Sequence, residues 1–446
     1  MRAIGIDIGT TTISAVVAES DSRRVEKSFT ISNGSFIETE NPWEKLQDPA
    51  VILRKSEELL EDILKEYPDI GVIGLTGQMH GIVYTDQEGR HVSPLYTWQD
   101  GRGNIPCGAG RSVCGMLEET YGVKLYTGYG MATHIYNSMA GLVPETAVSL
   151  CTIADYLGMV LTERNSPLLH AGNAAGLGLY DVRKCRFQKE VFDNLHLDCG
   201  MLPEVTDEFW ILGNCREIPV CVATGDNQAS FLGSVKNVRN SILVNMGTGG
   251  QVSVYSEKYF AAEGVATRLF IKDSCILCGS SLCGGRAYAL LADFFRQTGK
   301  AMGAEDVDPY RMMEHLLETE EEGQERLNVD TRFSGTRDCP ELKGSIGNIG
   351  TENFTPGALT RGVLEGMADE LYQMYLKMEK GIAGEKKTMI ASGNGLRRNR
   401  HLQEIMAERF SMRLELAEQK EEAAYGAALA GMIAAGAYQP EFLPVK

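Results

Sequence analysis

The chain has 446 residues, of which 43% are hydrophobic, and this length exceeds what one hydrophobic core usually organises. Its 43 basic and 60 acidic residues give a formal net charge of -17, which repels nucleic acid and anionic membranes. The composition therefore predicts an ordered protein of two domains that acts on small molecules, with neither nucleic acid nor a membrane as a partner.

The predicted elements alternate between strand and helix, which indicates α/β layers. In chain order they are a strand and turn at 1–12, a helix from 49 to about 67, a strand at 71–75, a helix from 356 to about 380, a strand at 388–392 and a buried helix within 423–438. Asp48-Pro49 and Thr355-Pro356 supply a capping side chain and a first-turn proline to the two long helices. The last helix is too short to cross a bilayer.

The N-terminus and the cysteines predict a cytoplasmic location. The opening MRAIGIDIGTTT is a strand and turn rather than the charged and then apolar segments of a signal peptide. The 11 cysteines are odd in number and follow no disulfide framework spacing.

One internal repeat is visible. An apolar strand ending in Asp7 and a Gly-Thr turn opens the chain, and a strand at 241–246 with the turn Gly247-Thr248-Gly249 restates that pattern, preceded by Gly225-Asp226. The repeat places a domain boundary near residues 220–240.

The two turns, Gly9-Thr10-Thr11 and Gly247-Thr248-Gly249, suit phosphate binding. Glycine and small hydroxyl residues let several backbone N–H groups approach one anion closely. Each turn alone is more often a plain hairpin, so the hypothesis depends on their paired occurrence. The sequence contains no GxxxxGK[ST], no GxGxxG at the start of a helix and no HRD with DFG, which argues against P-loop and protein-kinase folds.

Eight blocks, taken together, resemble the FGGY carbohydrate kinases over essentially the whole chain. They are IGIDIGTTT, GLTGQMHGIVYTD, TWQDGRG, ATGDNQAS, NMGTGG, LTRGVLEGMADEL, ASGNGLRRN and EEAAYGAALAG. The resemblance implies a duplicated actin-like ATPase (ribonuclease H-like) fold, with a catalytic cleft between two domains. It assigns 1–225 to an N-terminal domain with the sugar site and first phosphate turn, and 226–446 to a C-terminal nucleotide-binding domain. It also implies ATP and Mg²⁺ as cofactors.

Two aspartates are the expected chemical centre. Asp7 is placed to hold the hydration shell of Mg²⁺, because hard cations prefer carboxylate and water oxygens, although an aspartate here could also just cap the turn. Asp226 is the expected catalytic base, because a sugar hydroxyl must lose its proton to attack phosphorus. A Gly-Asp turn is commonly structural, and the resemblance to the family's GD motif is what favours catalysis. Gly225 is expected to let the chain turn sharply there.

The sugar-side candidates come from three segments. Gln78, Met79 and His80 follow the strand that ends at Leu75, where open α/β sheets present ligand-binding loops. Their amide and imidazole groups donate and accept hydrogen bonds, as hydroxyl recognition requires. The other candidates are Gln99, Asp100 and Asn173.

The nucleoside is expected to bind at Gly393-Asn394-Gly395, with Asn399 in the helix that follows and Gly285 beside the same pocket by analogy with the family. Bare backbone at these glycines allows the adenine and ribose to pack closely. For Asn394 alone, a left-handed turn before a helix is an equally good interpretation.

The substrate and the functional class each have alternatives. Within the family, the blocks resemble sedoheptulokinases most and xylulokinases next, and the small residues Ala171, Gly172, Ala174, Ala175 and Gly176 are expected to leave room for a seven-carbon ketose. Xylulose, ribulose and glycerol remain alternatives, because hydroxyl discrimination depends on fine placement of donors and acceptors. A non-enzymic actin-like ATPase switch is the alternative from another class. The sequence leaves open whether the chain forms a homodimer.

Overall fold

The computed structural model describes residues 1–107, 110–304, 308–319, 325–382 and 384–442. The chain forms two compact units. Unit 1 comprises Met1–Lys236, Arg268–Ser274 and Gln419–Lys446, and unit 2 comprises Asn237–Thr267 and Cys275–Glu418. The chain therefore returns to unit 1 twice after leaving it.

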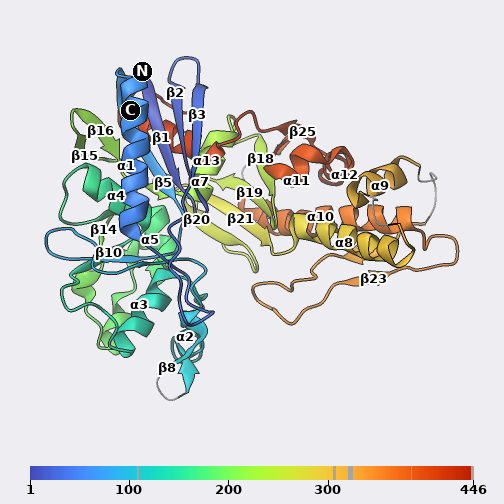
Figure 1. Cartoon of the computed structure of the whole chain (residues 1–446), viewed down its shortest axis with the longest axis horizontal. Coiled ribbons are helices and arrows are strands. Elements are labelled where there is room, and N and C mark those ends of the chain that lie inside the picture. The colour runs from blue at the N-terminus through green and yellow to red at the C-terminus, as the bar shows by residue number, and fades with distance from the viewer. Residues whose placement is uncertain (108–109, 305–307, 320–324, 383, 443–446) are drawn as a thin grey trace. The chain divides into compact units, whose positions relative to one another are not determined.

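Unit 1 is built on one twisted mixed sheet (Figure 1). Its strand order is β15 (Ile211–Cys215), β16 (Ile218–Cys221), β5 (Ile70–Gly77), β1 (Arg2–Ile8), β2 (Thr12–Glu19) and β3 (Arg24–Ser32), and the short β17 (Thr224–Gly225) also pairs with β5. β1 runs antiparallel to β2 and parallel to β5, with Asp7 opposite Ser14 and Thr76. This register brings the end of β1, the end of β5 and β17 to one edge of the sheet.

The helix α1 (Pro49–Glu66) forms where the sequence predicted a helix. The Asp48 side chain accepts a hydrogen bond from the Ala50 N–H and caps the helix, and Pro49 occupies its first turn. Before the first passage into unit 2, the chain also forms α2 (Val113–Tyr121), α3 (Gly130–Met139), α4 (Ile153–Leu161), α5 (Ala171–Leu177), α6 (Lys189–Asn194) and α7 (Asp226–Ser234). Its small sheets pair β4 (Leu46–Gln47) with β7 (Leu95–Tyr96), β6 (Val83–Thr85) with β10 (Ser149–Cys151), β8 (Pro106–Cys107) with β9 (Arg111–Ser112), β11 (Leu168–His170) with β14 (Glu204–Thr206) and β12 (Tyr180–Asp181) with β13 (Arg186–Phe187).

The predicted buried helix near the C-terminus is α13 (Glu422–Ala434), which packs against β1, β5 and α7 (Figure 1). Glycines on both sides make this close approach feasible. A Cβ added at Gly5 would lie 1.8 Å from the Ala424 carbonyl oxygen, and one at Gly74 would lie 1.8 Å from that of Ala427. Within the helix, Gly426 approaches α7 equally closely. The small residues of α13 thus allow backbone-to-backbone packing that larger side chains would prevent.

Unit 2 repeats the central topology of unit 1. Its sheet contains the run β21 (Cys275–Ser281), β19 (Gly250–Ser256), β18 (Ser241–Met246), β24 (Thr388–Ser392) and β25 (Arg413–Leu416). β18 is antiparallel to β19 and parallel to β24, just as β1 is to β2 and β5. Asn245 therefore occupies the place of Asp7, and its amide donates a 2.8 Å hydrogen bond to Ser392 Oγ. The internal repeat predicted from the sequence is confirmed at the level of strand pairing.

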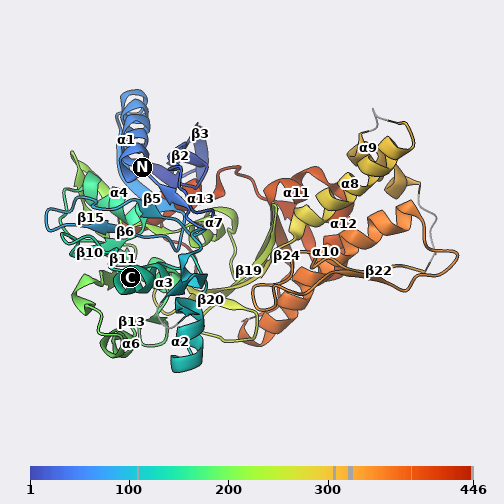
Figure 2. The same cartoon turned by 60° about the horizontal axis from the view of Figure 1, so that its bottom comes forward.

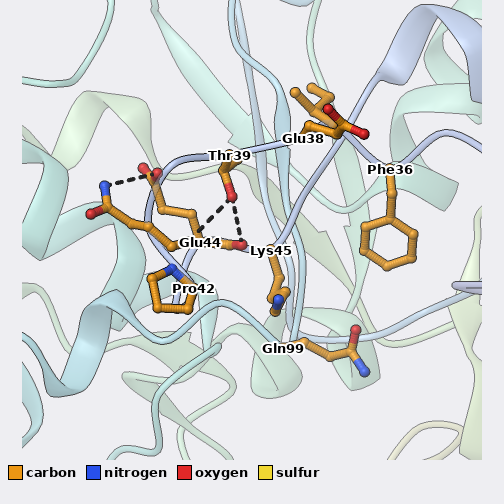
Figure 3. Close-up of a pocket in the computed structure, with 9 residues that line it drawn as sticks. Phe36, Glu38, Thr39, Pro42, Glu44, Lys45 and Gln99 are labelled. Atoms are coloured by element: carbon orange, nitrogen blue, oxygen red, sulfur yellow. Dashed lines mark hydrogen bonds between the residues drawn. The ribbon is translucent and has the colours of Figure 1, made fainter.

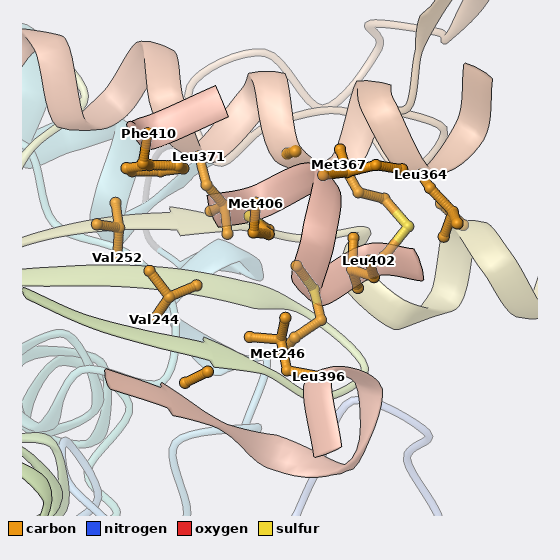
Figure 4. Close-up of a cluster of buried hydrophobic side chains, with 14 of the residues drawn as sticks. Val244, Met246, Val252, Leu364, Met367, Leu371, Leu396, Leu402, Met406 and Phe410 are labelled. Atoms are coloured by element: carbon orange, nitrogen blue, oxygen red, sulfur yellow. The ribbon is translucent and has the colours of Figure 1, made fainter. Parts of the chain in front are cut away.

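Helices cover this second sheet and enclose a hydrophobic core. They are α8 (Gly284–Ala301), α9 (Pro309–Glu318), α10 (Pro356–Met378), α11 (Gly393–Arg398) and α12 (Arg400–Phe410), with the small pair β22 (Asn328–Asp330) and β23 (Ser345–Gly347) beside α10 (Figure 2). The core joins Val244 and Val252 of the sheet to Leu371 of α10 and Phe410 of α12 (Figure 4). The predicted helix from Pro356 and the strand at 388–392 are both confirmed. β20 (Ala266–Leu269) spans a point where the chain passes between units. Among the helices within the described residues, none combines the length and apolarity needed to span a membrane.

Candidate active site

The first predicted phosphate turn joins β1 to β2, and its carbonyl groups are all held by protein donors. Asn33 Nδ2 donates to the Gly9 carbonyl at 2.7 Å, Gln47 Nε2 donates to the Thr10 carbonyl at 2.8 Å, and the Asn33 N–H donates to the Thr11 carbonyl at 2.9 Å. Because the carbonyl oxygens are engaged, the turn can present N–H groups and hydroxyls to an anion.

Asp7 precedes this turn and lies among other carboxylates. Burial, and then the negative charges of Asp226 and Glu421, raise the pKa of Asp7 to about 7. A divalent cation would relieve both the repulsion and the loss of solvation, so these residues fit Mg²⁺. The described residues contain no group of three or more His, Cys, Asp or Glu arranged as direct ligands. The fit is therefore to an ion held mainly through its hydration shell.

Asp226 opens helix α7 directly after β17. Asn227 Nδ2 donates a 2.8 Å hydrogen bond to Asp226 Oδ1. Burial raises the pKa of Asp226, while the positive charge of Arg268 and hydrogen bonds from Asn227 partly oppose that rise. A carboxylate with a raised pKa at a helix start is suited to accept a proton near neutral pH. The sequence did not single out Arg268, which is 42 positions from Asp226 and belongs to no recognised block.

Gly225, expected to allow a sharp turn, has an ordinary extended backbone with φ -67° and ψ 148°. That expectation is wrong, and the glycine is needed for space instead. A Cβ there would lie 2.6 Å from both Met79 Sδ and Gln228 Oε1. Gly225 therefore lets Met79 pack directly beneath the start of α7.

The sugar-side triplet follows β5 at the same edge of the sheet. Gln78 is buried, and its Nε2 donates to Gln47 Oε1 at 2.8 Å. His80 has a left-handed backbone, φ +75°, and its ring stacks on Tyr129 with centroids 4.4 Å apart. His80 Nδ1 lies 2.6 Å from the Gly176 carbonyl oxygen, which requires the proton on Nδ1 in the neutral ring.

Asp100 is fully buried and engaged with protein groups. It accepts hydrogen bonds from Arg102 Nε at 2.6 Å and from the Lys45 N–H at 3.1 Å. Arg102 is itself buried and lies over the Tyr96 ring at 4.2 Å. In this structure Asp100 anchors a buried arginine, and sugar binding by Asp100 stays a prediction.

Gln99 differs from its neighbour because it lines an open pocket of about 580 Å³ (Figure 3). The rest of the lining comes from one loop and comprises Phe36, Ile37, Glu38, Thr39, Asn41, Pro42, Glu44 and Lys45. The Thr39 hydroxyl donates to the carbonyls of Asn41 and Glu44, which holds the loop in shape (Figure 3). The pocket offers polar groups beside the exposed Phe36 ring.

Asn173 lies in α5 and is buried. Its Nδ2 lies 3.3 Å from each oxygen of Asp155 and 3.2 Å from the Ala223 carbonyl oxygen. The sequence did not single out Asp155, because no spacing rule connects α4 to α5.

The small residues around Asn173 do not leave the room that the sequence argument expected. A Cβ at Gly172 would lie 2.6 Å from Gln228 Nε2, and one at Gly176 would lie 2.8 Å from Met79 Cε. Protein atoms already fill the space at these two glycines, so neither leaves the room that the argument for a seven-carbon sugar assumed.

The nucleotide-side candidates converge in unit 2. The Gly285 N–H donates to the Gly247 carbonyl at 2.9 Å, so the start of α8 abuts the second phosphate turn. A Cβ at Gly249 would lie 2.6 Å from the Ser281 carbonyl oxygen. At the end of β24, Gly393 has φ +82°, and a Cβ there would lie 2.5 Å from the Met246 carbonyl oxygen. A Cβ at Gly395 would lie 2.8 Å from the same carbonyl oxygen.

The remaining nucleotide candidates are Thr248, Asn394 and Asn399. Thr248 accepts a hydrogen bond through its carbonyl from the Arg286 N–H, and Asn394 is exposed in α11. Asn399 is committed to capping α12, where its Oδ1 accepts from the Leu402 N–H at 2.9 Å.

Comparison with known sequences agrees with this arrangement. Residues 2–233 match the N-terminal domain of the FGGY family of carbohydrate kinases, and residues 242–435 match its C-terminal domain. Sedoheptulokinase from Mus musculus is 25% identical over 96% of this chain and 96% of its own length. Xylulose kinase from Lactococcus lactis is 24% identical over 92% of this chain and 83% of its own length. Gluconokinase from Bacillus subtilis is 22% identical over 97% of this chain and 87% of its own length.

Solved structures show the same fold. Xylulose kinase from Lactobacillus acidophilus superposes with a TM-score of 0.83 at 18% identity, covering 98% of this chain and 90% of that one. Xylulose kinase from Rhodospirillum rubrum gives a TM-score of 0.82 at 20% identity, covering 100% of this chain and 91% of that one. The fold is the duplicated actin-like ATPase fold expected from the sequence. The chain belongs to the FGGY family of carbohydrate kinases, and it is an enzyme of that class rather than a non-enzymic ATPase switch.

Proposed function

We propose that this kinase transfers the γ-phosphoryl group of ATP to a ketose, with sedoheptulose as the preferred acceptor and sedoheptulose 7-phosphate as the product. The observation that carries the proposal is the half-buried carboxylate of Asp226, which follows β17 beside Met79 in the sugar-side triplet. A base next to a hydroxyl-binding loop is what phosphoryl transfer to a sugar requires.

In this mechanism Asp226 accepts the proton of the attacking hydroxyl as its oxygen bonds to the γ-phosphorus and ADP leaves. Asn227 occupies Oδ1, so we assign proton transfer to Oδ2. Burial strengthens the carboxylate as a base, and Arg268 keeps that effect moderate. Asp7 would hold Mg²⁺ through water, and the ion when bound neutralises charge on the phosphates.

The choice of sedoheptulose rests on the relatives. The two sedoheptulokinases, from mouse and human, are each 25% identical over 96% of this chain and 96% of their own length. Xylulose is the second candidate, supported by the 24% identity to the Lactococcus lactis enzyme. We also propose the cytoplasm as the compartment, because the 11 cysteines of the sequence follow no disulfide framework spacing.

A coupled ADP-release assay on the full chain tests the substrate. We expect Mg²⁺-dependent ADP formation only when a sugar is added, and kcat/KM highest for sedoheptulose among sedoheptulose, xylulose, ribulose, gluconate and glycerol. A higher kcat/KM for xylulose would reverse the ranking. ATP hydrolysis that proceeds equally with no sugar would refute the proposed transfer.

A substitution tests the base. Asp226→Asn should lower kcat by roughly 10²- to 10⁴-fold, because the amide cannot accept the hydroxyl proton. Asp21→Asn, at an exposed position of unit 1, should leave kcat unchanged. Near-normal turnover by Asp226→Asn, with an unchanged melting temperature, would remove Asp226 from the mechanism.

A further inference from the structure

The loop that carries Asp226 is held by side chains that belong to neither the sugar-side triplet nor the phosphate turns. Residues Ala223 and Thr224 directly precede the Gly225-Asp226 step, and each uses its carbonyl to accept a hydrogen bond from a side chain. Asn173 Nδ2 donates to the Ala223 carbonyl at 3.2 Å, and Thr76 Oγ1 donates to the Thr224 carbonyl at 2.7 Å. Both donors are buried.

Asp155 determines which way the Asn173 amide points. An ionised carboxylate has no proton to donate, so it can only accept hydrogen bonds. The atom of Asn173 that lies 3.3 Å from the Asp155 oxygens must therefore be the amide nitrogen. Thr152 holds Asp155 in turn, since its hydroxyl donates to Asp155 Oδ2 at 2.6 Å and accepts from the Asp155 N–H at 3.3 Å. With both N–H bonds of the Asn173 amide directed at acceptors, its orientation is fixed.

The arrangement forms a chain from α4 through α5 to the catalytic loop. Thr224 and Gly225 also pair with Thr76 and Gly77 of β5, so this loop has a strand ladder on one side and the Asn173 donor on the other. Helix α7 begins at Asp226, and the one residue between it and Thr224 is Gly225, which is held in the ladder opposite Gly77. A shift in the Ala223 carbonyl therefore moves the Asp226 carboxylate directly.

Burying a carboxylate lowers the stability of the folded protein unless nearby groups donate hydrogen bonds to it. Burial raises the pKa of Asp155 to about 7, and the hydrogen bonds from Thr152 and Asn173 only partly oppose that rise. No cation is among the groups that shift it. Its function is thus to accept hydrogen bonds at the centre of unit 1, where the Asn173 amide is the partner that reaches the catalytic loop.

We propose that Asp155 and Asn173 are positioning residues, which hold the Ala223 carbonyl and thereby place the Asp226 carboxylate for proton transfer. Asn173, which the sequence offered as a sugar ligand, acts here through the base instead. This inference rests on the proposed role of Asp226.

The test compares kcat with KM in matched variants of the full chain. Asn173→Ala and Asp155→Ala should each lower kcat about 10- to 100-fold while KM for sedoheptulose and ATP changes less than about threefold, because misplacement of a reacting group by about 1 Å costs rates of that order. Asp155→Asn keeps an oxygen that can accept from Asn173, so its kcat should fall much less than that of Asp155→Ala.

Asn353→Ala is the control for lost stability. Asn353 is as buried as Asn173 and also donates its amide to a backbone carbonyl, that of Asn348, but it belongs to unit 2 and, within the described residues, makes no hydrogen bond to a site candidate. We expect Asn353→Ala to lower the melting temperature and leave kcat unchanged at a temperature where the protein is folded.

The outcomes separate this inference from the proposed function. If wild type is active and Asp226→Asn is not, then normal kcat in Asn173→Ala overturns the positioning role. A large rise in KM for the ketose at unchanged kcat would also overturn it, since Asn173 would then bind the sugar directly. Equal losses in Asp155→Asn and Asp155→Ala would show that the acceptor oxygen is irrelevant and would remove Asp155. Failure of the proposed function is seen separately, as normal turnover by Asp226→Asn.

Discussion

Asp7 and its neighbours Asp226 and Glu421 concentrate negative charge at the end of β1, and burial with this charge raises the pKa of Asp7 to about 7. Protons and Mg²⁺ should therefore compete for the Asp7 carboxylate. Below pH 7 the protonated form dominates, so the apparent Mg²⁺ affinity should fall about tenfold per pH unit, whereas above pH 7 it should be nearly constant.

Mg²⁺ titrations of kcat/KM at pH 6, 7 and 8 check this expectation. Asp7→Asn is the matched control, because an amide at the same position has no proton to exchange and its weaker Mg²⁺ dependence should not vary with pH in this way. An Mg²⁺ affinity for the wild type that is equal at pH 6 and pH 8 would contradict the role of Asp7.

At the scale of residues, the sequence predicted functional groups that lie within two residues of a glycine at the end of a strand. Asp7 and Asp226 are of this kind, and both are found where strands meet the sheet edge. It did not predict Asp155 or Arg268, because their closeness to the catalytic loop arises from tertiary packing between segments with no shared motif. Local patterns record backbone geometry, and they carry little information about which distant side chain completes a hydrogen bond.

Among the elements, α13 and the central strands of unit 1 approach each other backbone to backbone. A Cβ at Gly74 of β5 would lie 1.8 Å from the Ala427 carbonyl oxygen, so Gly74→Ala forces two backbones apart. We expect a loss of at least about 1–3 kcal/mol in the free energy of unfolding. Chemical denaturation measures it.

Gly347→Ala is the control for this substitution. Gly347 also lies in a strand, but a Cβ there would meet nothing closer than 3.8 Å. The free energy of unfolding of Gly347→Ala should stay within about 0.5 kcal/mol of the wild-type value. Similar effects of the two substitutions would mean that the strand position, and not the close approach of α13, sets the loss.

A second element-scale prediction concerns the turn after β24. Gly393→Ala places a Cβ 2.5 Å from the Met246 carbonyl oxygen, beside the second phosphate turn. We expect ATP affinity to fall at least about tenfold because the turn must shift, while ketose binding measured by calorimetry stays unchanged.

The chain offers a close control. Gly384 has a similar left-handed backbone, φ +75°, with nothing within 4 Å of an added Cβ. Gly384→Ala carries the same backbone strain without the collision, so it should bind ATP normally. If both variants bind ATP equally well, the Gly393 turn does not belong to the nucleotide site.

Element boundaries were predicted best where the signals are local. α1 and α10 begin at the expected Asp-Pro and Thr-Pro steps, because capping and proline are properties of adjacent residues. Two-residue strands such as β4 and β7 were not predicted, since only the pairing of Leu46 with Tyr96 and Gln47 with Leu95 defines them. The packing of α13 between β1, β5 and α7 likewise depends on partners distant in the chain.

For the whole molecule, four titratable groups of unit 1 give opposing responses of stability to pH. Burial lowers the pKa of His134 and of His170 to about 4, so the stability they contribute is present above 6.5 and is lost as the pH falls toward 4. Burial raises the pKa of Asp7 and of Asp155 to about 7, so their contribution is largest below 3.8 and is lost as the pH rises through 7.

Between about pH 4 and 6.5 the two effects oppose each other, and Asp155→Asn should unbalance them. This substitution removes one of the two carboxyl groups with a raised pKa. The slope of the free energy of unfolding against pH should therefore be more positive than in wild type by about 1.4 kcal/mol per pH unit. Urea denaturation at pH 4.5, 5.5 and 6.5 measures the slope. Asp21→Asn, at an exposed site, should run parallel to wild type, and a parallel line for Asp155→Asn would show that this carboxyl does not titrate differently in the folded state.

The position of α13 also has a consequence for biosynthesis. The Tyr425 hydroxyl donates a 2.7 Å hydrogen bond to the Arg23 carbonyl, a contact between residues 402 positions apart. While the ribosome is still making unit 2, β1 and β5 therefore expose the glycine-lined face that α13 will cover. Unit 2 draws on 237–267 and 275–418 and can complete its core first, although its sequence begins later. The nascent chain thus carries an unfinished first unit, with apolar surface exposed, until α13 emerges.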